Sequence, residues 1–471
     1  MAGPVRAPEE RAAAGKAARA TAPLEAHADF RPAESRDPVR LLLDQAKTRV
    51  PDLVPIRHGR MLVSPFTFYR GAARVMAADL QWTPTSGLRS QLCGDAHLAN
   101  FGAYASPERR LVFDINDFDE TLPGPFEWDV KRLAASLVVA GRDNGFTAKQ
   151  CRKVVLAGVE RYRTTLQKFA GQSITDVWYA HLNIEDVLAE FKAALPKPQR
   201  KANKARFKVA EDNLAKARTR DSLQAIAKLT TVSNGRRRII SNPPLIVPLA
   251  ELTGFDTDMV LEQVRGMLAT YRDTLQSDRR HLLDHFVLAD VAHKVVGVGS
   301  VGLRAWILLL ESGVKGEGLV LQAKQSEVSV LADYAGESEY ANQGERVVAG
   351  QRVMQATSDI FLGWLRAPAP TGGAEVDYYL RQLRDWKLSA DIETMSPQGM
   401  RLYAQLCGWT LARAHARSGD RIAIAAYLGG SATFDNAIAD LAEAYADQNE
   451  RDHAALAEAV AAGRVEAKGG V

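Results

Sequence analysis

The sequence predicts an α+β protein with two lobes, a large helical lobe and a small lobe built on an antiparallel sheet. The first observation is a set of long helical patterns, with apolar residues spaced to lie on one face, over 128–139, 148–170, 184–195 and 202–228. The second is a change in the residue pattern near Asp290, where the helical spacing gives way to short apolar runs separated by glycine. A chain of 471 residues is long enough for two or three such lobes.

The composition excludes several classes of protein. Hydrophobic residues make up 46% and charged residues 25% of the chain, which is typical of a globular protein. A net charge of +4 is too small to indicate a nucleic-acid partner, and the absence of a long apolar run argues against a membrane span. The three cysteines, Cys93, Cys151 and Cys407, are far apart and odd in number, which favours reduced thiols and a cytoplasmic location.

We expect four parts along the chain. Residues 1–37 lack a steady apolar period and are predicted to form a mobile tail. Residues 38–288 form the mainly helical lobe, 289–390 form the β lobe, and 391–471 form C-terminal helices that pack on the helical lobe. The last part begins with a helix over 399–418 and ends with a helical pair over 432–448 and 452–462.

The most informative stretch, residues 94–120, crowds carboxylates between short apolar runs. Asp95 and Asn100 stand five apart, the spacing of the catalytic loop of phosphotransferases, where the Asp accepts the proton of the substrate hydroxyl and the Asn holds a metal. A predicted buried strand delivers Asp114 or Asp117 to its end, where a second metal carboxylate is needed. The alternative is a polar turn whose acids only cap helices and turn the chain.

Two more side chains near this stretch have both a functional and a structural interpretation. His97, two residues after Asp95, can help to place a substrate or can make a structural hydrogen bond. Arg70 can contact a phosphate or can be an ordinary ion-paired surface arginine.

A glycine-rich loop lies between two predicted strands in the later half of the chain. Its backbone is expected to cover phosphates through Gly297, Gly299, Ser300 and Gly302. A dinucleotide-binding fold would place a helix directly after such a loop, whereas an apolar strand follows here. The next strand, 319–324, ends in Lys324, a candidate to pair with the α- and β-phosphates. Glu345, in the first turn of a predicted helix over 342–361, is the best candidate partner for Lys324, although Glu337 and Glu339 compete.

The strings GDAHLANFG and FDINDFDETLPGPFEWDVKRLAASL resemble a bacterial family, domain of unknown function 2252, over most of the chain. A weaker resemblance is to aminoglycoside and choline kinases, whose catalytic loops read His-Gly-Asp or His-Asn-Asp, then four residues, then Asn. Their metal-binding Asp lies in a triplet about twelve residues before another Asp. The triplet Asp117-Phe118-Asp119 followed by Asp129 has this interval, which favours Asp117 over Asp114. The kinase resemblance implies a protein-kinase-like fold, circularly permuted because the catalytic pieces precede the nucleotide-binding pieces.

Together these features predict an ATP- and Mg²⁺-dependent phosphotransferase that acts on an unknown hydroxyl-bearing acceptor. Asp95 would be the general base, Asn100 and Asp117 would hold Mg²⁺, and Lys324 would neutralise phosphate oxygens. Two alternatives remain. One is a metal-dependent phosphoesterase, because Gly-Asp-x-His opens such sites, and the other is a nucleotide-binding protein without catalysis. The acceptor and the oligomeric state are not predicted.

Overall fold

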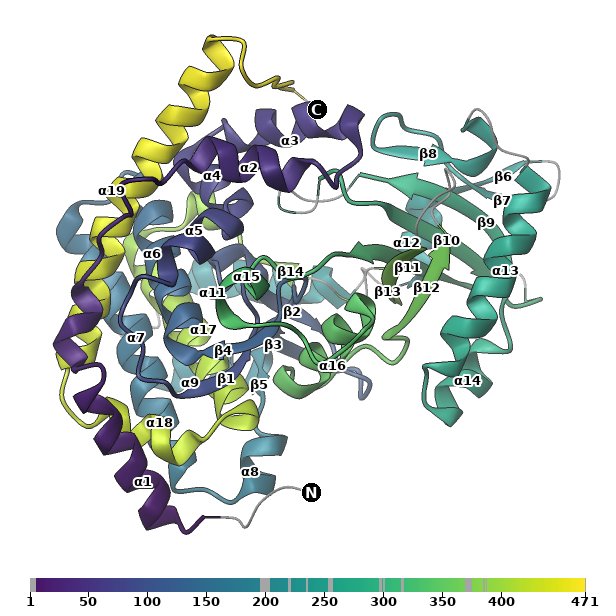
Figure 1. Ribbon diagram of the computed structural model, residues 1–471. Helices are drawn as coiled ribbons and strands as arrows, with labels where there is room; N and C mark the ends of the chain where they lie inside the picture. The colour runs from purple at the N-terminus through teal and green to yellow at the C-terminus, as the bar shows by residue number, and fades with distance from the viewer. Residues whose placement is uncertain are drawn as a thin grey trace.

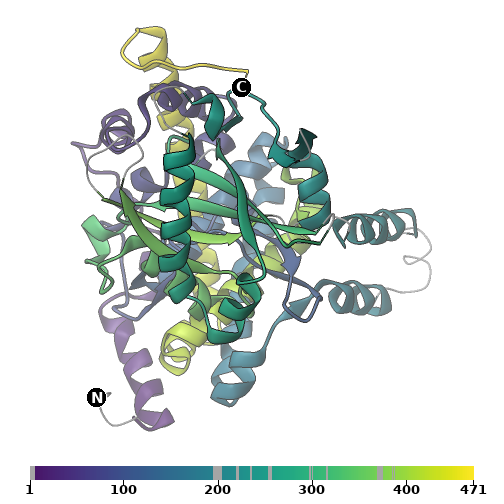
Figure 2. The same cartoon turned by 90° about the vertical axis from the view of Figure 1, so that its right-hand side faces the viewer.

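The structure is a computed structural model that describes residues 6–194, 204–218, 222–233, 236–252, 257–295, 299, 301–314, 317–368, 375–383, 386 and 388–470. The fold is α+β with antiparallel sheets, as predicted. A helical lobe and a lobe built on a six-stranded sheet lie side by side in Figure 1, the helices mainly at the left and the sheet at the right. In Figure 2, turned by 90°, the sheet lobe lies in front of the helical lobe.

The helical lobe is built from both ends of the chain. Its first helices are α1 (Pro8–Ala17), α2 (Pro38–Ala46), α3 (Val54–Met61), α4 (Pro65–Gly71), α5 (Ala73–Leu80), α6 (Phe126–Asp143) and α7 (Ala148–Ala170). Three shorter or peripheral helices follow, α8 (Ile174–Tyr179), α9 (Ile184–Ala194) and α11 (Lys204–Arg218). The C-terminal helices are α17 (Pro397–Ser418), α18 (Arg421–Leu428) and α19 (Thr433–Ala461). The last three pack on α6 and α7, so they belong to the helical lobe.

Local sequence explains the two central helices. The bounds of α7 agree with the predicted range, and Thr147 caps its start by accepting a hydrogen bond from the Gln150 backbone N–H. Helix α6 is buried along nearly its whole length, from Phe126 to Gly141, because other helices surround it. A helix so placed has few solvent-facing positions, and its polar residues must therefore find partners inside the protein.

The sheet lobe has strands in the order β12-β13-β11-β10-β9-β8, with every neighbouring pair antiparallel. These strands are β8 (Ile246–Pro248), β9 (Val287–Lys294), β10 (Ala305–Glu311), β11 (Gly318–Ser326), β12 (Gly363–Pro368) and β13 (Glu375–Gln382). The accompanying elements are α12 (Ser222–Leu229), β6 (Thr230–Ser233), β7 (Arg236–Ile239), α13 (Thr257–Asp273), α14 (Ser277–Leu283), α15 (Ala332–Ala335) and α16 (Gln343–Met354). Because β8 and β9 belong to the same sheet, that sheet extends across the expected lobe boundary at residue 289.

The alternation along β11 determines which of its side chains face the helical lobe. Leu319 and Leu321 pack in the core that includes Leu261 and Tyr271 of α13, which covers the outer face of the sheet (Figure 1). Side chains two residues apart share a face, so Lys324 lies on the opposite face, two residues beyond Gln322. That face borders the helical lobe.

Two small sheets lie in the helical lobe next to the sheet lobe. One has the order β14-β2-β3-β5 and the other pairs β1 with β4. Their strands are β1 (Arg89–Leu92), β2 (Phe101–Ala105), β3 (Leu111–Ile115), β4 (Leu122–Pro125), β5 (Leu182–Asn183) and β14 (Leu388–Ser389). The segment 93–100 connects β1 to β2, and the acidic run 116–121 connects β3 to β4. The two loops of interest thus leave adjoining sheets of one lobe.

Several sequence expectations require correction. Residues 6–37, expected to be mobile, instead pack on the C-terminal helices: Arg11 pairs with Asp420, and the buried His27 ring contacts the Tyr427 hydroxyl at 2.6 Å. The expected final pair of helices is one continuous helix, α19. The pattern over 202–228 divides between α11 and α12. The dipeptide Asn234-Gly235, which is typical of a hairpin turn, lies outside the described residues.

Two other expectations concern cysteines and membrane spans. All three cysteines are buried and unpaired. Among the described helices, none combines the length and the apolar composition that a membrane span requires.

Candidate functional site

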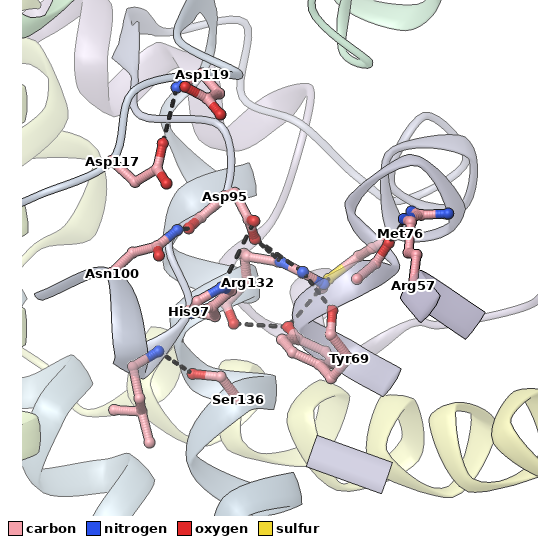
Figure 3. Close-up of polar contacts among 12 residues, drawn as sticks. Arg57, Tyr69, Met76, Asp95, His97, Asn100, Asp117, Asp119, Arg132 and Ser136 are labelled. Carbon is pink, nitrogen blue, oxygen red and sulfur yellow. Dashed lines mark hydrogen bonds and ion pairs between the residues drawn. The ribbon is translucent and has the colours of Figure 1, made fainter. Parts of the chain in front are cut away.

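One face of α6 positions the loop that carries Asp95. Asp129, Arg132 and Ser136 occur at intervals of three and four, so they lie along one stripe of this helix. Asp129 accepts hydrogen bonds from the backbone N–H groups of Cys93 and Gly94, at 2.8 and 3.1 Å. Ser136 accepts one from Leu98, at 3.2 Å, which Figure 3 shows together with the contacts of Arg132. The buried helix thus holds both ends of the loop.

The Asp95 carboxylate is oriented by Arg132. The Nε and Nη2 atoms of Arg132 lie 2.9 and 2.8 Å from Asp95 Oδ1 (Figure 3). Oδ2 of Asp95 lies 3.6 Å from Nε2 of His97, which is beyond an ordinary hydrogen bond. Burial lowers the pKa of His97 to about 4, so this imidazole is neutral at neutral pH. Asp95 therefore has one oxygen fixed by an arginine and the other near a neutral imidazole.

The backbone at Gly94 allows this loop to turn toward the acidic run. Gly94 has φ of +83°, and a Cβ there would clash with the Glu120 carbonyl. Asp129, which holds the Gly94 N–H, also contacts His415 Nε2 at 3.3 Å. His415 Nδ1 in turn lies 2.8 Å from the Tyr162 hydroxyl. A buried chain of three side chains therefore connects the start of the loop to α7 and α17.

The acidic run meets Lys324 from the other lobe. The Lys324 ammonium forms an ion pair with Asp119 and lies 3.8 Å from the Asp117 carboxylate. Asp119 also accepts a hydrogen bond from the Tyr379 hydroxyl at 3.0 Å. Burial alone would lower the pKa of Lys324, but Asp117 and Asp119 raise it above its usual range, so the lysine is cationic.

Arg346 and Glu120 connect the acidic run 116–121 to the sheet lobe. Arg346, on α16, donates to the backbone carbonyls of Thr121 and Asp119 at 2.6 and 2.8 Å. Glu120 accepts a hydrogen bond from the Val330 backbone N–H at 2.7 Å. Burial raises the pKa of Glu120 to about 7. The loop is thus anchored by groups of the sheet lobe.

A cavity of about 700 Å³ brings these groups together. Its walls come from both lobes and include six of the residues predicted from the sequence: Asp95, His97, Asn100, Asp117, Gly299 and Lys324. The lining also includes the apolar side chains of Ile360 and Leu383 and the polar side chains of Gln45, Arg60 and Arg70. Such a volume is in the range of pockets for small organic ligands.

The oxygen groups at the centre of the cavity fit a magnesium ion that is shared with a ligand. The Asn100 amide nitrogen donates to the Asp95 carbonyl at 2.7 Å, which leaves the side-chain oxygen of Asn100 as its acceptor group. Asp117 is one-third exposed and lies beside Asn100 and Asp95 (Figure 3). Among the described residues no group of three or more His, Cys, Asp or Glu is arranged to hold a metal. Magnesium commonly uses one or two carboxylates together with substrate phosphates, and this donor set matches that arrangement.

Three predicted site residues lie away from the centre of the cavity. Asp114 is buried in an ion pair with Arg413, and its two oxygens accept hydrogen bonds from the N–H groups of Ile115 and Ala356. Glu345 lies in the first turn of α16 as predicted, but the ion pairs of Lys324 are with Asp117 and Asp119. Gly302 packs against Arg49 with φ of +93° and accepts a hydrogen bond from Val50 N–H. Gly297 and Ser300 lie outside the described residues.

The comparisons with known proteins agree with the sequence resemblance. The family described as "Uncharacterized protein conserved in bacteria (DUF2252)" matches residues 49–459. The chain belongs to this family. No curated protein and no solved structure matched the chain.

Sequence reasoning missed the residues that hold the Asp95 loop in this DUF2252 protein. Asp129 was noted only for its interval from Asp117, while Arg132 and Ser136 were not singled out. A signal was present, because Asp129, Arg132 and Ser136 recur at helical spacing inside the mainly apolar segment 126–141, which also contains Glu127 and Lys131. Arg346 carried no local signal, since a single arginine in an ordinary helix is common on protein surfaces.

Proposed function

We propose that this protein is an ATP- and Mg²⁺-dependent phosphotransferase with a circularly permuted, protein-kinase-like fold. The observation that carries the proposal is the meeting of Lys324, from the later half of the chain, with Asp117, from the earlier half, at 3.8 Å. The sequence hypothesis requires these side chains to lie within about 10 Å, the span of a triphosphate with its metal. Asp95 and Asn100 line the same cavity.

The order of elements in the sheet lobe supports a nucleotide site. A glycine-containing segment connects β9 and β10, Lys324 lies on the next strand, β11, and α16 follows before β12. Protein kinases place a glycine-rich loop, a strand with the phosphate-binding lysine and a helix in this succession. The loop with Asp95 and Asn100 precedes all of them in the chain, which is why we infer a permuted order.

Each group then has a chemical task. Asp95, held through one oxygen by Arg132, is placed to accept the proton of an acceptor hydroxyl through the other oxygen. Lys324 stabilises negative charge on the phosphates, and the Asn100 and Asp117 oxygens hold Mg²⁺. When bound, the ion would neutralise phosphate charge during transfer. Leu383, Ile360 and Tyr104 line the part of the cavity where a base would lie.

The present ion pairs indicate what nucleotide binding would exchange. Lys324 is neutralised by Asp117 and Asp119 without a ligand. Mg-ATP brings a cation, Mg²⁺, and an anion, the triphosphate. Asp117 can then bind Mg²⁺ in place of Lys324, and Lys324 can bind the phosphates in place of Asp117. This exchange keeps each buried charge paired, which limits the cost of opening the site.

The test combines nucleotide binding with turnover. We expect Mg-ATP, and not ATP with EDTA, to raise the melting temperature, because a ligand that binds only the native state stabilises it. Asp95→Ala should keep this shift and lose about a hundredfold to ten-thousandfold in ATP turnover, the usual contribution of a positioned base. Asp186→Ala, an exposed carboxylate on α9, is the matched control and should behave as wild type.

The outcomes separate the alternatives. Binding without turnover in the wild-type protein would assign a nucleotide-binding protein instead of an enzyme. Release of phosphate from phosphoesters by a protein that ignores nucleotides would assign a metal-dependent phosphoesterase. The absence of a nucleotide effect in either measurement would overturn the proposal.

A further inference from the structure

Part of the cavity wall is rich in arginine. Arg49, Arg57, Arg60 and Arg70 all come from the segment of α2, α3 and α4 and the turns between them, and Arg60 and Arg70 line the cavity. Arg57 is fully buried and Arg49 is 6% exposed. Within the described residues, Arg49, Arg57 and Arg70 form no ion pair with a carboxylate. Arg49, Arg57 and Arg70 therefore concentrate positive charge beside the cavity, and carboxylates such as Glu120 and Asp95 act on them only from beyond ion-pair distance.

Their hydrogen bonds are also incomplete. Arg57 donates through Nη2 to Gln45 Oε1 and to the Gly71 carbonyl, each at 2.8 Å. Its Nε and Nη1 atoms, and the Nε atoms of Arg49 and Arg70, are buried without a hydrogen-bond partner among the described residues. Burial lowers the pKa of all three arginines, although a guanidinium remains charged in proteins. Burying an unpaired cation is costly, so an anion beside these arginines would stabilise the protein.

The cavity wall presents donors to such an anion. Gln45 and Gly71 both line the cavity, so Arg57 lies directly behind them. Because Gln45 uses its carbonyl oxygen to accept from Arg57, its amide N–H₂ group is the donor left to face a ligand. Arg70 adds a guanidinium whose planar fork suits phosphate and carboxylate groups. The wall thus offers N–H groups from Gln45, Arg60 and Arg70.

Arg70 is the member of this cluster that interacts with Asp95, whereas Glu120 and Glu327 act on Arg49 and Arg57. The Asp95 carboxylate acts on Arg70 and raises its pKa against the effect of burial. Arg70 likewise acts on His97, next to Asp95. The nucleotide phosphates are assigned to Lys324, so Arg70, beside Asp95, is available to the acceptor.

We propose that the acceptor is a small anionic alcohol, with its hydroxyl at Asp95 and its phosphate or carboxylate group bound by Arg70, Arg60 and Gln45. This inference rests on the proposed function for the role of the hydroxyl, whereas the anion site itself rests on the arginines. The acceptor is then held at both of its ends, by Asp95 at the hydroxyl and by the arginines at the anionic group. This orients the hydroxyl toward the transferred phosphoryl group.

The experiment measures melting temperature in saturating Mg²⁺ with a non-hydrolysable ATP analogue. The probes are glycerol 3-phosphate and glycerate, with glycerol and matched sodium chloride as uncharged and ionic-strength controls. We expect at least one anionic probe to raise the melting temperature of the wild type, and glycerol to have no effect. Arg70→Gln should weaken that probe at least tenfold while the analogue still binds. Arg142→Gln, an exposed arginine paired with Asp447 and Glu450, is the matched control and should behave as wild type.

Arg70→Lys sharpens the test because it keeps the charge and loses the planar fork, and we expect an intermediate affinity. An anionic probe that binds Arg70→Gln as well as wild type overturns the proposal. Competition between the anionic probes and the ATP analogue also overturns it, because the arginines would then bind nucleotide phosphates. Analogue binding without any response to the anionic probes overturns the anionic acceptor and leaves the phosphotransferase standing. An Arg70-dependent anion response in a protein that ignores nucleotides overturns the phosphotransferase and retains the anion site.

Discussion

Two carboxylates three residues apart have opposite environments in this protein. Asp114 and its partner Arg413 are each 1% exposed, and backbone N–H groups complete the hydrogen bonds of the carboxylate. Asp117 is 33% exposed, and it faces Lys324 across 3.8 Å at the cavity. Strand β3 ends at Ile115, between the two. A carboxylate inside the strand is thus part of the core, and one just beyond the strand is available to a ligand.

The comparison shows that a cation beside a carboxylate does not reveal its role. Both pairs join elements far apart in the chain, but Asp114 has every oxygen engaged by fixed groups. The Asp117–Lys324 pair borders a cavity, and Asp119 provides the lysine with a second partner. An ion pair whose members have alternative partners, such as Asp117–Lys324, can rearrange when a ligand enters, and we call it open. An ion pair such as Asp114–Arg413, whose carboxylate oxygens are all engaged by fixed groups, can only be broken, and we call it closed.

The largest expected effect is on stability at the closed pair. Asp114→Ala leaves the Arg413 guanidinium buried without its partner, so we expect a loss of about 3–5 kcal/mol in the free energy of unfolding. Urea denaturation measures it. Asp117→Ala is the matched control and should cost about 1 kcal/mol or less, because it is partly exposed and Lys324 keeps Asp119. Equal losses in the two variants would contradict the distinction between a closed and an open pair.

The next effect is on nucleotide binding at the open pair. Asp117→Asn and Lys324→Ala should each weaken Mg-ATP binding, and the double variant should lose less than the sum. The expected coupling energy is about 0.5–3 kcal/mol, because both groups contact one ligand. Calorimetric titration of the four proteins gives this value, with Lys149→Ala on exposed α7 surface as the control. If Asp114→Asn loses Mg-ATP affinity while Asp117→Asn retains it, the metal ligand is Asp114.

The smallest effect is a pH dependence from Glu120, the third carboxyl group in this run. Burial raises its pKa from 4.5 to about 7 in the folded protein. Between these two pH values Glu120 is protonated in the folded protein and ionised in the unfolded chain. The free energy of unfolding therefore falls as the pH rises from 4.5 to 7, and it becomes constant above pH 7. The slope from one group is at most about 1.4 kcal/mol per pH unit. Urea denaturation from pH 5 to 8 should show a flatter profile for Glu120→Gln than for wild type. A change of the same size in Glu458→Gln, on an exposed position of α19, would contradict the assignment to Glu120.

Much of the candidate site was predictable because its signals are local. The interval between Asp95 and Asn100 is set by one short loop, and the apolar run before Lys324 is a strand, with the lysine facing the cavity. The kinase resemblance assigns Lys324 and Asp117 to one ligand, and the two side chains lie 3.8 Å apart. Asp117 follows an apolar strand and Lys324 lies on another, and both strands have a clear apolar pattern. An error of one or two residues in the predicted ends of these strands therefore does not change where the two side chains are expected.

The remainder depended on contacts that no local pattern encodes. The choice of Asp119 over Glu345 as the Lys324 partner depends on how the two lobes approach each other. The closed pair of Asp114 required Arg413, about 300 residues later, to be buried beside it. Residues 6–37 have too few apolar side chains to predict packing, and they are held to the last helices by individual polar contacts and by a few apolar side chains such as Leu24 and Phe30.

The packing of residues 6–37 on the last helices also constrains how the chain folds during synthesis. Arg11 contacts Asp420 and Arg36 contacts Asp452, so residues 6–37 lack these partners until more than 400 further residues have been synthesised. During that interval β1, the Asp95 loop and α6 can form, but the helices that enclose α6 are still missing. Contacts of such long sequence separation slow folding and leave apolar surface uncovered. A nascent chain stopped before Asp420 should therefore require chaperone protection that the full-length protein does not.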